Sequence, residues 1–320
     1  MANKTAVILG CNGQDGSLLS QSLLNKGYRV IGVSKTQKKR ESNLQKLGIE
    51  EHIELIFGDM TQIDFLEKLI VQYSPAEIYN LASQSSVGLS FAKPITTIES
   101  IITITIKLLE ACREISYTGR IFFAGSSEIF GNTDKRANIQ YTQDPQSPYA
   151  IAKQTSFNLV KMYRDVFSLK CMTGVLFNHE SSLRSDTFVT QKIIKAAKEI
   201  SQDKSIKLRL GNIEVIRDWG WAPEYIEAMQ IIINSSNIND HVICTGEAHT
   251  LKDYISQVFS FYELQWEDHV TLDKKFLRSN EILKSYGDPQ PLFNELGWKA
   301  KIGFSMIVNN LISNSIKNKH

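Results

Sequence analysis

The sequence predicts an α/β fold in which a doubly wound parallel sheet is followed by a smaller C-terminal α/β lobe. Short apolar runs alternate with helical patterns through residues 1–180, which is typical of βαβ units with right-handed crossovers. A glycine-rich turn follows the first apolar run and opens a helical pattern. The 320 residues suffice for two domains, or for one large unit with an appended lobe, at roughly 100–200 residues per domain.

The first half of the chain contains six expected strands and the helices between them. Apolar residues recur at helical spacing over 17–26, and Gly27 is a typical helix stop, so a helix is expected there. Longer helices are expected over about 102–115 and 148–167. The strands are expected at 5–9, 29–34, 54–57, 77–82, 120–125 and 171–177.

The alternation loosens after about residue 180, which predicts a second lobe. We expect a dinucleotide-binding domain over 1–180 and a sugar-nucleotide-binding lobe over 181–320, with a boundary soft by tens of residues. Some strands of the second part are expected to return to the main sheet. Its helices are expected near 187–202, 222–235 and 251–262, and its strands near 207–210 and 241–244.

Composition excludes several classes of protein. A net charge of +2 gives no strong field for nucleic acid or a membrane surface, and 42% hydrophobic residues are ordinary for a globular chain. No apolar stretch reaches the ~18 residues of a transmembrane helix. The four cysteines form no C-x-x-C pair, which argues against a zinc ribbon and a disulfide scaffold, and no metal site is expected. No signal peptide is evident, so a cytoplasmic protein is expected.

The turn after the first strand is the first candidate for chemistry. Gly10, Gly13 and Gly16 are spaced G-x-x-G-x-x-G at the start of a helix. Glycines permit close approach of a pyrophosphate, and the helix N-terminus supplies N–H donors. A tight turn without a ligand is the alternative. The position after the first buried strand favours dinucleotide binding, as in Rossmann-like folds.

The ends of the second and third strands bear on which dinucleotide binds. An acidic residue usually follows the second strand of an NAD site, whereas Ser34-Lys35 stands here. Because a cation pairs with a 2′-phosphate, Lys35 favours NADP over NAD, whereas a basic run such as 38–40 is more commonly a solvated face. Asp59 could accept a hydrogen bond from the adenine amino group or cap the next helix.

Tyr149 and Lys153 lie four residues apart at the start of a predicted helix and therefore share a face. A lysine ammonium lowers the pKa of a nearby tyrosine, which can then take a proton from a substrate hydroxyl while a hydride leaves. Ser126 and Glu128 follow the fifth strand. All these positions fall at the carboxyl ends of strands, where open α/β sheets bind ligands.

These motifs resemble the GDP-mannose 4,6-dehydratase branch of the extended short-chain dehydrogenase/reductase family, over nearly the whole chain. The Asn-His-Glu and Arg-Asp-Trp-Gly segments are the most specific to that branch. The matching segments include Gly13-Gln-Asp-Gly-Ser17, Tyr79-Asn-Leu-Ala-Ser-Gln-Ser85, Ser127-Glu-Ile-Phe-Gly131, Ser147-Pro-Tyr-Ala-Ile-Ala-Lys153, Leu176-Phe-Asn-His-Glu-Ser181, Arg217-Asp-Trp-Gly220, Thr245-Gly-Glu247 and Leu296-Gly-Trp298.

The resemblance implies a mechanism with a tightly bound NADP that is recycled. Tyr149 would be the base that starts oxidation at the sugar C4, supported by Lys153, and Ser126 would hydrogen-bond the C4 oxygen. Glu128 would be the acid/base that eliminates water across C5 and C6; a charge at a helix N-terminus is its structural alternative. The hydride would return to C6, so that GDP-mannose gives GDP-4-keto-6-deoxymannose.

The resemblance also implies the remaining binding residues. His179 is a candidate to face the nicotinamide, and a structural histidine explains it equally well. Trp219 and Trp221 are interpreted as packing residues. The implied cofactor set is Gly10, Gly13, Gln14, Asp15, Gly16, Lys35, Asp59, Met60, Leu81, Ser83, Tyr149, Lys153 and His179. The implied set for the GDP-sugar is Ser85, Asn178, Lys192, Arg217, Arg278 and Glu281.

Several departures from the family pattern keep alternatives open. They favour a divergent dehydratase, which could act on another GDP-sugar such as a GDP-heptose. An NADPH-dependent 4-ketoreductase or epimerase would need no Glu128, and a non-catalytic protein would need none of the four catalytic residues. The resemblance also implies a homodimer or homotetramer, formed through the helices at 102–115 and 148–167. The departures are Lys35-Thr36, Gln146, Ser181-Ser-Leu-Arg-Ser185, Gln191 and Arg278-Ser279.

Overall fold

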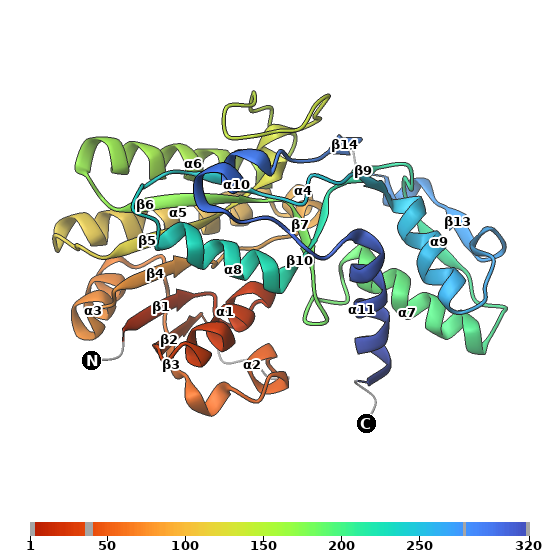
Figure 1. The fold of residues 1–320 in the computed structure, drawn as a ribbon, viewed down its shortest axis with the longest axis horizontal. Coiled ribbons are helices and arrows are strands. Elements are labelled where there is room, and N and C mark those ends of the chain that lie inside the picture. The colour runs from red at the N-terminus through yellow and green to blue at the C-terminus, as the bar shows by residue number, and fades with distance from the viewer. Residues whose placement is uncertain (1–3, 36–40, 278–279, 318–320) are drawn as a thin grey trace.

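The computed structural model describes residues 4–35, 41–277 and 280–317. For residues 316 and 317 it describes the backbone alone. Its centre is a parallel sheet of seven strands in the order β11-β6-β5-β4-β1-β2-β3 (Figure 1). This doubly wound order confirms the predicted fold class. The strands are β1 (Thr5–Leu9), β2 (Arg29–Ser34), β3 (Glu54–Phe57), β4 (Glu77–Asn80), β5 (Arg120–Ser126), β6 (Cys171–Leu176) and β11 (His241–Ile243).

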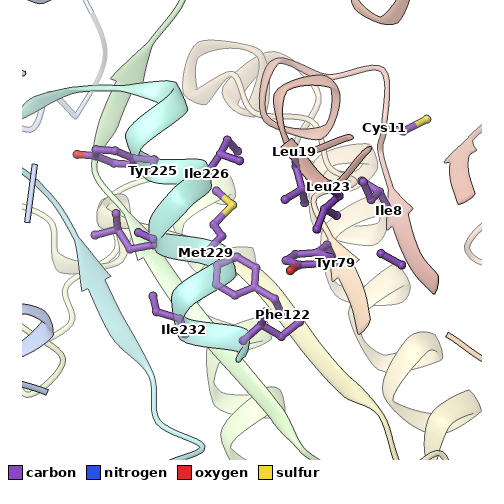
Figure 2. Packing of buried hydrophobic residues seen from close by; sticks show 14 of the residues in the cluster. Ile8, Cys11, Leu19, Leu23, Tyr79, Phe122, Tyr225, Ile226, Met229 and Ile232 are labelled. Atoms are coloured by element: carbon purple, nitrogen blue, oxygen red, sulfur yellow. The ribbon is translucent and has the colours of Figure 1, made fainter. Parts of the chain in front are cut away.

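One face of the sheet is covered by α1 (Gln14–Asn25), α8 (Ala222–Ile233) and α10 (Gln290–Leu296). Figure 2 shows Met229 of α8 close to the sheet residues Tyr79 and Phe122, which are fully buried. Since a strand alternates its side chains, the other face carries the remaining apolar residues, as Val7 and Leu9 of β1 do. That face is covered by α3 (Ile63–Tyr73), α5 (Pro94–Glu114) and α6 (Pro148–Phe167).

Most predicted elements are confirmed, and the differences lie at their ends. The first helix begins at Gln14 rather than 17, because Ser17 N–H already donates to the Gly13 carbonyl (3.0 Å). The long helix α5 begins at Pro94 rather than 102. Proline suits a first helical turn, since it lacks an N–H that would have no partner there, and the polar residues that follow it hide the apolar periodicity.

The chain beyond residue 180 adds strand β11 to the main sheet and covers one face of that sheet with α8 and α10. It also builds a second packed region. There α7 (Val189–Gln202), α9 (Leu251–Phe261) and α11 (Phe304–Lys317) surround a separate apolar core, beside small sheets (Figure 1). Trp219 packs against Tyr254 and Phe304 in that core, as expected of a packing residue. The short strands are β7 (Asn178–Glu180), β8 (Leu208–Leu210), β9 (Ile216–Arg217), β10 (Trp219–Trp221), β12 (His249–Thr250), β13 (Val270–Leu272) and β14 (Lys284–Ser285).

Short helical turns complete the fold. In the part of the chain that the structure describes, every helix is too short or too polar to cross a lipid bilayer. The four cysteines are buried thiols that form no disulfide within the described residues. The remaining turns are α2 (Asn43–Lys46), α4 (Val87–Ala92), η1 (Glu50–His52), η2 (Ser127–Phe130), η3 (Trp266–Asp268) and η4 (Lys274–Phe276).

Candidate active site

The glycine turn between β1 and α1 is built for close backbone contact. Gly10 has φ +85°, and a Cβ there would lie 2.9 Å from the Ala82 backbone. A Cβ on Gly16 would lie 2.3 Å from the Gly10 carbonyl oxygen. Any side chain at either position would therefore displace the chain. The predicted turn is confirmed, and two of its three glycines are required by its geometry.

The third glycine, Gly13, precedes α1 and is exposed. Its backbone is extended, and no side chain caps the helix. The N–H groups of the first turn are therefore not covered by a capping side chain at the carboxyl edge of the sheet. These N–H groups and the helix dipole suit a pyrophosphate. The turn therefore fits the dinucleotide that the spacing predicts. When bound, such a cofactor accepts and returns a hydride.

The first turn of α1 is also joined to strand β7. The Gln14 amide donates to the His179 carbonyl (3.2 Å) and accepts from the Ser181 hydroxyl (2.9 Å). The His179 imidazole Nε2 lies 3.0 Å from both carboxylate oxygens of Asp15. Sequence analysis assigned Gln14, Asp15 and His179 to the cofactor as separate contacts. The structure brings them together, and their contact with a cofactor stays a prediction.

The Asp15–His179 pair is charged. Burial acts to raise the pKa of Asp15, but the His179 charge and hydrogen bonds lower it to about 2. Burial acts to lower the pKa of His179, and the Asp15 carboxylate more than offsets this, so that the pKa is raised. The other ring nitrogen, Nδ1, lies 2.7 Å from the Phe177 carbonyl oxygen and donates to it. Both nitrogens of His179 therefore act as donors, as in an imidazolium.

Three of the four predicted catalytic residues are brought together where β5 meets α6. Ser126 is the last residue of β5 and hydrogen-bonds Tyr149, which lies in the first turn of α6. The Lys153 Nζ donates to the Ala124 carbonyl (2.9 Å) and lies 5.8 Å from the centre of the Tyr149 ring. Ser147 fixes this arrangement because its hydroxyl caps α6 by accepting from Ala150 N–H (3.1 Å).

Burial controls the charges in this cluster. It raises the pKa of Tyr149 to about 12, with the Glu128 charge adding to the rise and the Ser126 hydrogen bond opposing it. Burial also lowers the pKa of Lys153 to about 8. The protein alone therefore holds Tyr149 as a neutral phenol at pH 7. A ligand that brings positive charge toward the phenol, or that excludes water around it, would change this balance.

Glu128, the fourth catalytic candidate, lies in the short helix η2 directly after β5. Its N–H donates to the Ser126 hydroxyl at 3.4 Å, and its charge influences the pKa of Tyr149. The side chain is half-buried. The carboxylate thus lies near the phenol, as the elimination role requires. It also occupies the first turn of a helix, so the structural alternative is met as well.

The adenosine end of the predicted cofactor site lies at the ends of β2, β3 and β4. Lys35 is exposed after β2. The pKa of Asp59 is lowered mainly by its hydrogen bonds from Thr61, and the Lys35 charge adds to this lowering. Asp59 accepts from the N–H and hydroxyl of Thr61 (3.1 and 2.8 Å), which stabilises the turn before α3. It does not cap that helix, because the N-cap residue is Gln62 and no side chain caps the helix. Met60 is buried, and Leu81 and Ser83 are half-buried beyond β4. Residues 36–40, with the basic run 38–40, lie outside the described residues.

The predicted substrate residues are spread over the second region. Arg217 is buried on β9 with Nη2 3.7 Å from a Glu281 carboxylate oxygen, so the structure brings these two together. Lys192 donates to the Arg209 carbonyl (3.1 Å) and lies over the Phe276 ring. Asn178 is half-buried on β7. Ser85 is exposed beyond β4, whereas Arg278 lies outside the described residues.

Sequence reasoning gave no role to Arg184, although the structure places it at the site. Its charge influences the pKa of both Tyr149 and Asp15, and its Nε lies 3.6 Å from Glu180. The buried Nε has no hydrogen-bond partner among the described residues. The segment Ser181–Ser185 was noted only as a departure from the family pattern. Its retained arginine was the signal that could have identified this residue.

Asp218 is a second residue without a predicted role, in the specific Arg-Asp-Trp-Gly segment. It is fully buried and accepts from the N–H and hydroxyl of Thr245 (2.9 and 2.6 Å) and from Gly246 N–H (2.8 Å). It also accepts from Gly287 N–H at 3.3 Å. One carboxylate thereby joins β10, the loop after β11 and the segment before α10.

We expect Asp218→Ala to destabilise the fold by about 3 kcal/mol or more, because each buried donor left unsatisfied costs about 1–3 kcal/mol. Urea unfolding of the purified variant measures this. Asp203→Ala is the matched control, since Asp203 accepts from the N–H and hydroxyl of Ser205 at the exposed surface. Its effect should stay within about 0.5 kcal/mol. Equal losses in both variants would contradict the structural role of Asp218.

Comparison with known proteins identifies the family of these motifs. A sequence model described as GDP-mannose 4,6 dehydratase matches residues 7–311. GDP-mannose 4,6 dehydratase 1 of Arabidopsis thaliana is 35% identical and aligns over 98% of this chain and 90% of the plant protein. GDP-mannose 4,6-dehydratase of Vibrio cholerae is 31% identical over 99% of this chain and 95% of its own.

Solved structures share the fold. The dTDP-glucose 4,6-dehydratase DesIV of Streptomyces venezuelae, solved with NAD, superposes with a TM-score of 0.88 over 98% of both chains. Its sequence identity of 17% limits the likeness to the fold. The similarity of sequence identifies the family, and the similarity of structure supports the fold.

Proposed function

The chain belongs to the GDP-mannose 4,6-dehydratase family, and from this premise we propose that it converts GDP-mannose to GDP-4-keto-6-deoxymannose with a retained NADP. The observation that carries the proposal is the arrangement of Ser126, Glu128, Tyr149 and Lys153 around the end of β5. A base, its hydrogen-bonding partner and a separate carboxylate are the groups that oxidation and elimination on one sugar require.

The first step needs a proton acceptor at C4. Tyr149 takes the proton of the C4 hydroxyl, and Ser126 hydrogen-bonds the same oxygen. Lys153 stabilises the phenolate electrostatically once the site is loaded, because the ammonium lies beside the ring. The bound cofactor would supply the hydride acceptor for C4 and the hydride donor for C6.

The second step needs a second acid/base group, because Tyr149 is then engaged at C4. The C4 ketone acidifies the C5 hydrogen, so Glu128 removes it as a proton. The same carboxyl group protonates the departing C6 hydroxyl, which leaves as water. C6 then receives the hydride, and C5 receives a proton that balances the one Tyr149 took from the C4 hydroxyl. The net change is loss of one water without net oxidation or reduction.

The experiment is incubation of the purified protein with GDP-mannose and no added cofactor, followed by mass spectrometry of the nucleotide sugar. Loss of the mass of one water without net change in NADPH supports the proposal. An unchanged substrate, also after addition of NADP, would contradict it. A GDP-heptose and a 4-keto sugar with NADPH, assayed in parallel, report on the related substrates and on net reduction.

We propose NADP rather than NAD because Lys35 occupies the end of β2 where an acidic residue would favour NAD. Lys35→Ala is expected to weaken NADP binding about tenfold and to leave NAD binding nearly unchanged, because only NADP carries the 2′-phosphate that the ammonium pairs with. Titration calorimetry with each nucleotide measures this. Lys35→Arg keeps the charge and serves as the control. An equal loss for both nucleotides would contradict the assignment.

We also propose a cytoplasmic homodimer or homotetramer. Phe91 of α4, Ile95 of α5 and Ile151 of α6 are exposed apolar residues on neighbouring helices, as a subunit interface requires. In the helix expected at 102–115, by contrast, Leu109 is fully buried and belongs to the core, so it is not available to a subunit interface.

A further inference from the structure

Two family motifs that lie 165 residues apart meet in one buried cluster. Gln14 and Asp15 come from the turn that opens α1, and His179 and Ser181 come from β7 and the residue after it. Two hydrogen bonds of Gln14 and the charged Asp15–His179 contact, at 2.9–3.2 Å, join the two segments. We call these four residues the α1–β7 clamp. It connects the phosphate side of the cofactor site to the strand that carries Asn178.

The clamp is held from several directions. The His179 ring stacks on the Tyr225 ring of α8, with centroids 4.7 Å apart and planes inclined by 23°. Gly220 of β10 pairs with His179, and a Cβ on Gly220 would lie 2.1 Å from the Tyr225 ring, so the ring packs closely against β10 as well as β7. The His179 ring thus makes three contacts at once: the stack on Tyr225, the Asp15 contact and the Phe177 hydrogen bond. Movement of the glycine turn therefore requires movement of β7, or rupture of the clamp.

The proposed reaction requires the cofactor site and the sugar site to be held together, as the α1–β7 clamp would do. The hydride taken from C4 has to return to C6 of the same sugar, so cofactor and sugar must stay in place throughout. The glycine turn suits the cofactor, and β7 carries a predicted sugar-binding residue. A contact between these two segments would hold cofactor and sugar in position and slow their release.

We propose that Asp15 and His179 are positioning residues that couple the glycine turn to β7 and thereby slow the release of NADP. The proposal rests on the proposed use of NADP, but it is tested without the sugar reaction. The nearby charges do not replace the pair. Arg184 lies against Glu180, and Lys153 donates to the Ala124 carbonyl. Asp15 and His179 are thus each other's closest charged partners in the clamp.

The test is the NADP dissociation rate, measured by displacement with excess unlabelled nucleotide from protein that carries labelled NADP. We expect Asp15→Asn and His179→Asn each to raise this rate by at least about tenfold. NADP should dissociate from the double variant no faster than from either single variant, because all three variants lose the same Asp15–His179 contact. Ser181→Ala removes the other link and should raise the rate as well, although Ser181 belongs to no predicted cofactor contact.

Hydrogen exchange separates coupling from stability. In the unaltered protein NADP should protect both the glycine turn and residues 178–181, whereas in Asp15→Asn it should protect the turn alone. His241→Asn is the control. His241 is a buried histidine on the distant strand β11, and its Nε2 lies 3.6 Å from a carboxylate oxygen of Glu295 on α10. The rate at which NADP dissociates from this variant should be unchanged.

Three outcomes would overturn the inference. Unchanged dissociation rates in folded variants would reduce the clamp to a stabilising contact. Effects of Asp15→Asn and His179→Asn that multiply in the double variant would indicate two independent cofactor contacts. Protection of 178–181 by NADP in every variant would show that the segments are coupled in another way. Failure of the unaltered protein to bind NADP would instead contradict the proposed function.

Discussion

Replacing Tyr149 by phenylalanine is expected to lower turnover of GDP-mannose about 10²–10⁴-fold, because the variant has no group to accept the C4 proton. The substitution removes one oxygen from a buried ring, and the Ser126 hydroxyl can rotate to another partner. Folding and nucleotide binding should therefore persist. Steady-state assay by mass spectrometry of the nucleotide sugar measures the loss, and NADP titration confirms that the variant still binds its cofactor.

Tyr163→Phe is the matched control on the same helix. Tyr163 is also buried and its hydroxyl hydrogen-bonds Glu110, but it lies away from the β5 end. This variant should turn over normally. Substantial turnover in Tyr149→Phe, or an equal loss in both variants, would remove Tyr149 from the role of base at C4.

The pH dependence of turnover follows from the same group. The pKa of Tyr149 is raised to about 12 in the protein alone, so the phenolate is scarce at pH 7 and becomes more abundant as pH rises. Turnover by the unaltered enzyme should therefore increase with pH until Lys153, with a pKa lowered to about 8, loses its proton. A rising limb that survives in Tyr149→Phe would contradict this origin.

The sequence predicts the sheet well because its central strands are buried on both faces. Runs such as Val30 to Val33 are apolar at nearly every position, and glycine or polar residues mark their ends. Helix starts are less well predicted, because the signal at Pro94 is a single residue among polar neighbours. Periodicity therefore locates the elements that pack against the sheet and misplaces the turns that begin them.

The sequence predicts those parts of the candidate site in which the residues are close together in the chain. Tyr149 and Lys153 share a helix face, so their proximity follows from spacing alone. Asp15 and His179 lie 164 positions apart in the sequence, so no local pattern of residues predicts their contact. Asp218 is missed for a related reason: its donors belong to loops whose course depends on the assembled sheet. Long-range polar contacts therefore need the fold before they can be identified.

Glu128→Gln is the prediction that separates the two halves of the proposed reaction. Glutamine has nearly the same shape but neither accepts the C5 proton nor returns one to the C6 oxygen. We expect formation of the 6-deoxy product to fall about 10²–10⁴-fold while oxidation at C4 continues. Trapping with borodeuteride should then find deuterium at C4 of a hexose that retains its C6 hydroxyl. Exchange of the C5 hydrogen with deuterated solvent should be lost.

Asp134→Asn is the control for this experiment, because Asp134 is an exposed carboxylate in the segment between β5 and α6 that is hydrogen-bonded by Tyr141. It should leave both steps unchanged. Full product formation by Glu128→Gln would assign elimination to another group, and Glu128 would remain a charge at a helix N-terminus. Loss of C4 oxidation together with elimination would mean that Glu128 acts on Tyr149 rather than on C5. The selective block is expected because Glu128 lies on its own turn beyond β5, apart from the helix that carries Tyr149 and Lys153.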